Sequence, residues 1–195
     1  NSASRLPMGA FQQGGTSERQ DFVDLMRETF AALGMTEELS FSFTSEKTFD
    51  KLGVPEDSVL RQAIPIMNPL TDEYPLIRTT LLTSVLENAA RNVARKNMDL
   101  RLFDIAPVFF PKALPVTELA HEKLMVAGLI TGRRNPIAWD TDNAQVDFYD
   151  MKGILERFLS AIGVQKYTVE RGAHFAMHPG KTAFFKKGRD VIATL

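Results

Sequence analysis

Two histidines four residues apart, His174 and His178, form the pattern in this chain that most directly suggests chemistry. On a helix, this spacing would place both imidazoles on one face, where they could share a metal ion. However, Pro179 disfavours a helical conformation at His178, and Gly180 permits unusual backbone angles. No carboxylate lies at a matching offset. We therefore expect no metal site here, and we expect His178, Pro179 and Gly180 to set the start of a hairpin.

Other patterns typical of catalytic sites are absent or have simpler explanations. The sequence has no cysteine, which excludes disulfides and thiolate chemistry, and it has no phosphate-binding glycine-lysine loop. Several aspartates lie close together and could suggest a magnesium site. Helix caps and solvated loops are the expected explanation, with a magnesium site as the alternative; the residues are Asp140, Asp142, Asp147 and Asp150.

Arg78 is the basic residue with the most informative setting. It follows an apolar run, and Asp72 and Glu73 lie nearby in the sequence, so a structural ion pair is the first expectation. The alternative is a remnant of a substrate site or a contact to a partner. A net charge of −1 argues against binding to nucleic acid through bulk positive charge. We expect the other basic residues to be solvated, with contact to a nucleic-acid backbone as the alternative; they are Arg133, Arg134, Lys181, Lys186, Lys187 and Arg189.

The elements that must position these residues include more strands than helices. Apolar residues at helical spacing predict helices over about 17–33, 45–52, 80–96 and 147–162, the first opened by a capping box of Ser17 and Gln20. Alternating or continuous apolar runs predict strands over 39–44, 63–67, 100–110, 123–131 and 166–170, and a hairpin of 182–185 with 191–195. This order predicts an α+β fold with a largely antiparallel sheet flanked by helices.

A set of large apolar residues lies on the first helix and the strand after it. A helix stripe that faces its own sheet needs no partner, so a core role explains these residues. The alternative is that some are exposed and form a contact surface for another chain. The candidates are Phe22, Leu25, Met26, Phe30, Phe41 and Phe43.

Length and composition fit one domain. The chain has 195 residues, 44% hydrophobic and 24% charged, which are ordinary values for a globular protein. Residues 1–16, rich in Gly, Ser and Gln, predict a linker or cloning remnant, and 17–195 predict a single core domain. The last predicted strand runs to the end of the chain, so we expect a truncated domain. No apolar run could cross a bilayer, and the absence of cysteine fits a cytoplasmic location.

Several short strings, in order, make the chain resemble the synthetase-like core of the phenylalanyl-tRNA synthetase β subunit of the bacterial type. The strings are LPMG at 6–9, LSFSF at 39–43, NPL at 68–70, IRTTLL at 77–82, ARN at 90–92, LFDIAPVF at 102–109, VDFYDMKG at 146–153 and HPGKTA at 178–183. Residues 104–106 read Asp-Ile-Ala where the family usually has Glu-Ile-Gly, which keeps a carboxylate and a small residue. Each string alone is weak, but their shared order spans 6–195.

The resemblance implies a class II aminoacyl-tRNA synthetase-like fold, with the first helix and strand at a subunit interface. It also implies a heterotetramer of two α and two β chains, in which the α subunit attaches phenylalanine to tRNA using ATP and magnesium. No cofactor is expected in this part of β, and a tRNA contact here would be weak. Asn68 and Pro69, like Arg78, are candidates for structural positions or remnants of an ancestral site.

Catalytic class II domains carry an arginine just after the strand that resembles 102–109, where it binds the ATP phosphate. Here the strand runs on into Pro111 and Lys112, which lack the forked donors of a guanidinium. Another arginine could reach the place, with Arg78 and Arg101 as candidates. We therefore expect a non-catalytic scaffold that supports the α subunit. The alternative function is a synthetase-like domain that binds a small molecule for regulation.

Overall fold

The computed structural model describes residue 9 and residues 14–195, so most of the predicted linker and the LPMG string lie outside the described residues. The first helix, α1 (Glu18–Ala32), begins where the sequence predicts, because the Ser17 hydroxyl accepts a hydrogen bond of 3.2 Å from the Gln20 amide. The second half of the predicted capping box is wrong: the Gln20 side chain donates to Asp24 instead of returning to Ser17. Gly34 ends the helix with a positive φ.

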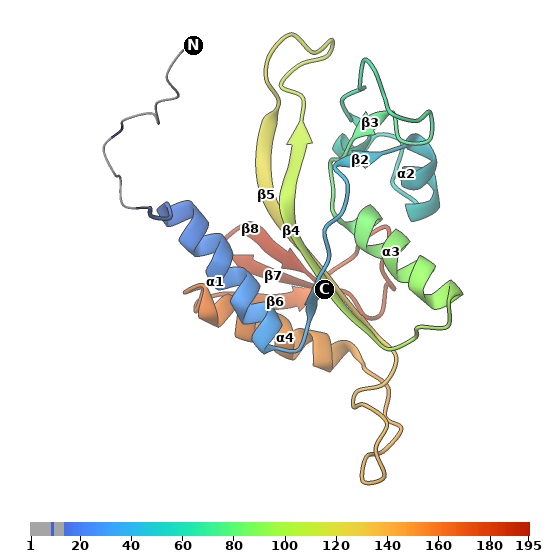
Figure 1. Cartoon of the computed structure of the whole chain (residues 1–195), viewed down its shortest axis with the longest axis vertical. Coiled ribbons are helices and arrows are strands. Elements are labelled where there is room, and N and C mark those ends of the chain that lie inside the picture. Colours follow the sequence, from blue (N-terminus) through green and yellow to red (C-terminus); the bar gives the residue numbers. More distant parts are fainter. Residues whose placement is uncertain (1–8, 10–13) are drawn as a thin grey trace, which may run out of the picture.

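A long hairpin dominates the first sheet (Figure 1). It consists of β4 (Leu100–Phe110) and β5 (His121–Thr131), which pair antiparallel along their whole length. The short strand β1 (Thr36–Glu37) adds to β4 in parallel, so the sheet order is β1-β4-β5. The predicted strand at 100–110 is confirmed as the central strand of this sheet, and the one at 123–131 starts two residues earlier.

The second sheet is antiparallel throughout. It contains β6 (Thr168–Arg171), β7 (Ala183–Lys187) and β8 (Asp190–Thr194), with Gly188 in the turn of the predicted hairpin. The helix before it, α4 (Phe148–Ala161), opens with a complete capping box of Asp147 and Asp150. With a two-stranded third sheet, β2 (Phe43–Thr44) and β3 (Leu76–Ile77), these sheets confirm the predicted α+β fold, in which the β1–β4 pair is the parallel exception among the described strands.

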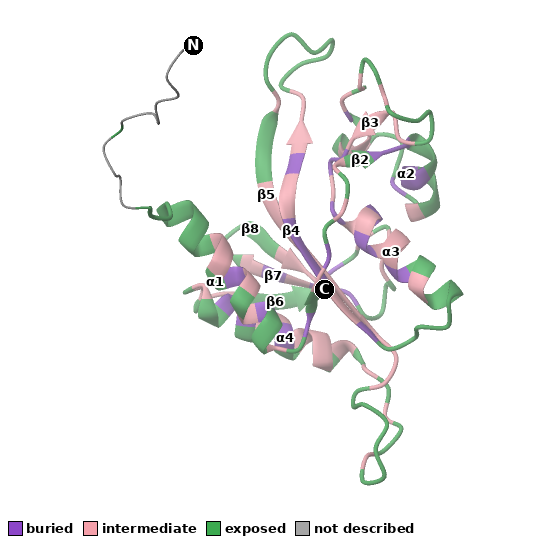
Figure 2. Cartoon of the chain, viewed as in Figure 1, coloured by how far each residue is buried: buried purple, intermediate pink, exposed green. Residues whose placement is uncertain are grey.

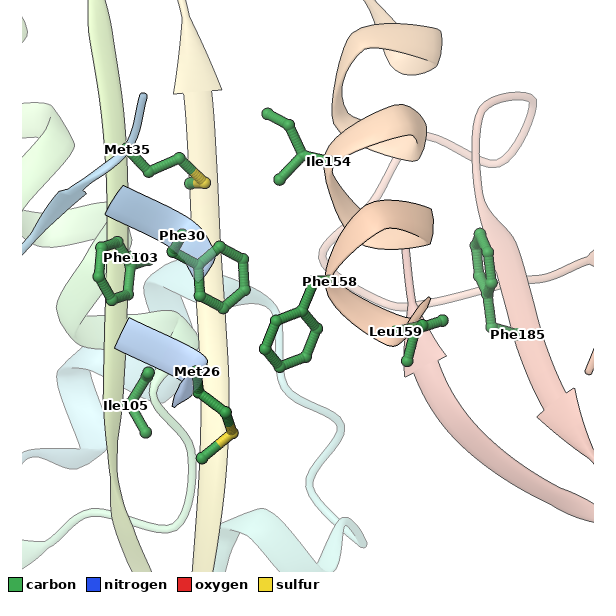
Figure 3. Close-up of a cluster of buried hydrophobic side chains, with 9 residues drawn as sticks. All are labelled: Met26, Phe30, Met35, Phe103, Ile105, Ile154, Phe158, Leu159 and Phe185. Atoms are coloured by element: carbon green, nitrogen blue, oxygen red, sulfur yellow. The ribbon is translucent and has the colours of Figure 1, made fainter. Parts of the chain in front are cut away.

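The main core lies between α1, α4 and one face of the first sheet (Figure 3). Phe30 stacks on Phe103 from β4 at 4.9 Å between ring centres and on Phe158 from α4 at 4.4 Å. Met26 lies beside them and is equally buried. For Met26 and Phe30 the expectation of a partner surface is therefore corrected: their stripe faces the protein's own core, where another chain could not reach them.

The opposite face of β4 is covered by a separate group of elements on the other side of the hairpin (Figure 1). The long helix here is α3 (Leu82–Ala94), whose first amide bonds to the Thr80 hydroxyl at 3.2 Å. A smaller cluster of Phe49, Val54 and Ala63 is buried beside it. The other elements are α2 (Glu46–Leu52), the short 3-10 helix η1 (Val59–Arg61), β2 (Phe43–Thr44) and β3 (Leu76–Ile77).

Two predicted strands in this region are largely wrong. Of the run at 39–44, only β2 forms a ladder, and it pairs with β3, which the sequence analysis did not predict. The run at 63–67 contributes a single bridge, between Pro65 and Leu76. At residues 40–41 the carbonyls accept from the Arg78 side chain rather than from a neighbouring strand, and Pro65 has no amide for a strand on the side away from Leu76.

Candidate functional site

The guanidinium of Arg78 lies in the protein interior, where it joins its own segment to β4 and to residues 40–41. Only 2% of the residue is exposed. Its Nε donates to the carbonyl of Pro107 on β4 at 2.9 Å, and its Nη1 donates to the Ser40 hydroxyl at 2.7 Å and the Phe41 carbonyl at 3.3 Å. The predicted ion pair exists, but its partner is Asp104 at 3.8 Å and not a carboxylate near in sequence.

Asp104 completes this buried cluster. It is 2% exposed and accepts a hydrogen bond from the Ser40 hydroxyl. Burial raises the pKa of Asp104, while the bond from Ser40 and the charge of Arg78 act in the opposite direction. Burial lowers the pKa of Arg78, and the charge of Asp104 opposes that shift. Such a cluster positions the 40–41 segment against β4, and it leaves Arg78 no access to a ligand.

Just after β4, where catalytic class II domains carry a phosphate-binding arginine, this chain has Pro111 and Lys112. Lys112 lies at the exposed start of the loop that joins β4 to β5, and it pairs with Glu118 at 3.4 Å. Arg101 lies at the other end of β4, where it donates to the carbonyl of Arg134. Arg101 therefore brings no forked cation to the C-terminal end of β4, and the Arg78 guanidinium, which does reach Pro107 there, is bonded inside the protein.

A groove of about 570 Å³ opens beside this cluster, between α3 and the segments before β2 and β3. Most of its wall is apolar, and its polar residues converge from α3 and the 38–43 segment. Asn68, one of the candidate remnant-site residues, lies in this wall, whereas its neighbour Pro69 does not. The lining residues are Glu38, Leu39, Ser40, Phe41, Phe43, Ile66, Asn68, Leu70, Thr71, Glu73, Tyr74, Ser84, Glu87, Asn88 and Arg91.

Glu38 is the unusual residue of this groove, and the sequence analysis missed it. It is 8% exposed, and its Oε2 accepts a hydrogen bond from the Asn88 side chain. Its Oε1 is buried without a hydrogen-bond partner among the described residues. Burial raises the pKa of Glu38, and the bond from Asn88 opposes this shift. No sequence signal could have identified it, because its isolation depends on residues fifty positions away.

Glu38→Gln is expected to stabilise the chain more at pH 7 than at pH 4. Because the folded pKa of Glu38 lies above its ordinary value of 4.5, its contribution to stability is present below that value and is lost as pH rises through the folded pKa. The glutamine side chain of the variant does not titrate, and its carbonyl can still accept from Asn88. Urea denaturation of both proteins across this range measures the difference, and a difference that does not change with pH would contradict the argument.

The histidine pattern has a structural explanation. His178 Nδ1 accepts from the Gly180 amide at 3.0 Å, and the His178 carbonyl accepts from Thr182. His174 Nδ1 likewise accepts from the Ala176 amide, so both imidazoles bond to their own backbone. Gly180 is not among the glycines with positive φ. A Cβ at this position would lie 3.3 Å from the His178 ring, a close contact that a small shift of the exposed ring would relieve.

Asp147 and Asp150 act as helix-cap and ion-pair partners. Asp147 accepts from the amides of Tyr149 and Asp150 at the start of α4. Arg134 pairs with Asp150 at 3.0 Å, and this contact lowers the pKa of that carboxyl. Across the part of the chain that the structure describes, no group of three or more acidic or histidine side chains could hold a metal ion.

The remaining apolar candidates are exposed and lie in two places (Figure 2). Phe22 and Leu25 are on the outer side of α1. Phe41, 83% exposed, and Phe43 lie at the groove, together with Leu39, which is 89% exposed and was not among the candidates. Alternation along 39–43 cannot separate an exposed side chain from one that faces a sheet, because both follow the same period.

Comparison with known proteins gives one consistent result. The family model for the phenylalanyl tRNA synthetase beta chain CLM domain matches residues 3–195. The phenylalanine–tRNA ligase beta subunit of Syntrophotalea carbinolica is 36% identical over 174 residues, 89% of this chain and 21% of that protein. The subunit from Clostridium acetobutylicum is 36% identical over 182 residues, 93% of this chain and 21% of its own length. The chain thus spans about a fifth of these relatives.

Solved structures place the fold. The pyrrolysyl-tRNA synthetase of Desulfitobacterium hafniense aligns with a TM-score of 0.65 at 12% identity, covering 91% of this chain and 58% of that one. A second structure of that synthetase aligns with a TM-score of 0.63. These matches confirm the predicted class II synthetase fold. With the family match over 3–195, they show that the chain belongs to the family of phenylalanyl-tRNA synthetase beta chain CLM domains.

Proposed function

We propose that this chain is a non-catalytic scaffold of phenylalanyl-tRNA synthetase, which holds the α chain while α attaches phenylalanine to tRNA. The burial of Arg78 is the observation that carries the proposal. A class II active site needs a guanidinium aimed at phosphate. In this chain the guanidinium of Arg78, the candidate for that role, bonds to Pro107, Ser40 and Phe41 inside the protein. ATP and magnesium would therefore be held by α and not by this part of β.

The proposal includes the assembly and the setting. Two α and two β chains would form the holoenzyme in the cytoplasm, with residues 17–195 as one domain after a linker at 1–16. No helix in the described part of the chain combines the length and apolar character that crossing a bilayer requires. The side chains of Lys186 and Arg134 already pair with Glu170 and Asp150, which supports a minor role for tRNA contact here.

Exposed apolar residues support a contact with α. Phe22 and Leu25 form one surface, and Leu39, Phe41 and Phe43 form another. Large apolar side chains gathered on the surface mark sites of protein association. These side chains are between 37% and 89% exposed in the isolated chain.

Phe22→Asp and Phe41→Asp are each expected to weaken binding of full-length β to α by about thirtyfold or more, because a charge would then be buried at an apolar contact. Surface plasmon resonance with purified α measures the dissociation constant. Val59→Asp, at another exposed apolar residue, is the control and should change it by less than about threefold. If wild-type β does not bind α, or if all three variants bind like wild type, the scaffold proposal is wrong.

The groove favours a second candidate, a regulatory domain that binds a small molecule. Its volume of about 570 Å³ is in the usual range of ligand pockets, roughly 300–1,000 Å³. Saturable thermal stabilisation of β by ATP or by an amino acid would support this function over the scaffold.

A further inference from the structure

We propose that the groove beside Glu38 receives a lysine or arginine side chain of the α chain, whose apolar neighbours pack on Leu39 and Phe41. The inference rests on the proposed scaffold function. It makes that function specific by naming the charge of the α side chain at the contact and Glu38 as the residue that binds it.

One oxygen of the Glu38 carboxylate is an unused hydrogen-bond acceptor. Glu38 is more than nine-tenths buried, yet its Oε1 has no hydrogen-bond partner among the described residues. Buried polar groups are almost always paired, since an unpaired carboxylate oxygen loses its hydration without compensation. A donor brought by another molecule would complete the pair. The raised pKa of Glu38 agrees with this, because burial disfavours its charged form more than the bond from Asn88 and the charge of Arg91 favour it.

Two asparagines of α3 hold the Glu38 carboxylate in place. Asn92 on α3 donates through its side chain to the Asn88 side-chain oxygen at 3.1 Å, which fixes the orientation of that amide. The Asn88 nitrogen is thereby directed to Glu38 Oε2. One carboxylate oxygen is anchored to a helix and the other is left over. A carboxylate held in this way loses little conformational freedom when a donor arrives.

The charged residues that line the groove are mostly acidic. The groove lining contains the carboxylates of Glu38, Glu73 and Glu87, against the single guanidinium of Arg91. An occupant that carries positive charge complements this wall, and an anion does not. Lysine and arginine also suit the shape, because their apolar stems can line an apolar wall while the charged end reaches the carboxylate.

The exposed apolar side chains of the groove favour a protein segment over a free small molecule as its occupant. Leu39, Phe41 and Leu70 line the groove, yet each is at least 83% exposed. A ligand confined to the groove would leave most of this apolar surface in water. A polypeptide segment would cover it and insert one basic side chain, and Phe41 already belongs to the surface proposed to contact α.

The test uses full-length β and purified α. Glu38→Gln keeps the size of the side chain and an acceptor for Asn88 but removes the charge, so it is expected to raise the dissociation constant about tenfold or more. Glu73→Gln, at an exposed carboxylate of the same groove, is the matched control and should change it less than about threefold. An unchanged constant for Glu38→Gln would overturn the inference.

A second measurement identifies the occupant without relying on that variant. A photoreactive residue at Leu39 should cross-link to a segment of α that contains a lysine or arginine. Neutralising that residue should weaken binding, and adding Glu38→Gln should weaken it no further. Cross-links within β, or independent effects of the two changes, would overturn the inference. If wild-type β binds α and Phe41→Asp weakens it while Glu38→Gln does not, this inference fails and the scaffold proposal stands.

Discussion

Arg78→Met is expected to lower the free energy of unfolding by about 3–5 kcal/mol, because it leaves the Asp104 carboxylate buried without its counter-charge. The same change frees the Pro107 carbonyl and the Ser40 hydroxyl from the bonds that tie the 40–41 segment to β4. Urea denaturation at pH 7 measures the loss. Lys112→Ala, which removes an exposed pair with Glu118, should cost no more than about 1 kcal/mol.

The pH dependence of this variant gives a second check. Without Arg78, burial raises the folded pKa of Asp104 further above its ordinary value, so the carboxyl is stable in the interior only when protonated. Its contribution to stability is then present below the unfolded pKa and is lost as pH rises through the folded pKa. The difference between wild type and Arg78→Met should therefore shrink as pH falls. A difference that is small at pH 7, or that grows in acid, would contradict the role assigned to this pair.

Phe30→Ala is expected to lower the free energy of unfolding by about 3–5 kcal/mol, since the ring is buried between Phe103 and Phe158 and its loss leaves a cavity. Phe22→Ala is the matched control on the same helix. Its ring is 43% exposed, so the loss should be about 1 kcal/mol or less. Thermal or urea unfolding compares the two.

The pair also separates stability from assembly. We expect Phe22→Ala to weaken the contact with α while leaving the fold intact, because its side chain lies on the outside of α1. Phe30→Ala should act on α binding only through the folded population of β. Equal losses of stability in the two variants would mean that α1 is packed differently from the arrangement in Figure 3.

Local sequence patterns predicted the long elements well, because those elements depend on residues near each other in the chain. The cap at Ser17 follows from its side-chain oxygen, and the stop at Gly34 and the hairpin turn at Gly188 follow from the positive φ that glycine allows. The largely apolar sequence of β4 is typical of a strand covered on both faces, and both faces of β4 are covered. The ordered strings of the resemblance led to the family that the comparison confirmed.

The same patterns could not divide the apolar candidates between core and surface. Phe30 and Phe22 lie on one helix and have one side-chain type, but only Phe30 faces α4. Leu39 and Phe41 alternate like residues of a half-buried strand, yet no sheet lies against them, since the Arg78 side chain bonds to the backbone at that point. Which face of an element is covered depends on which other elements reach it.

The amino-acid sequence by itself determined the α-helices, the long strands, the α+β class, the family and the absence of a forked cation after β4, since each depends on residue identity or short-range spacing. Tertiary structure alone decided that Arg78 pairs with Asp104, that Met26 and Phe30 are core residues, and that Glu38 lies in a groove with one oxygen unpaired. The physical reason is common to all three. Pairing and burial are properties of contacts between distant segments, and the residues that make those contacts stand 26 to 128 positions apart in the chain.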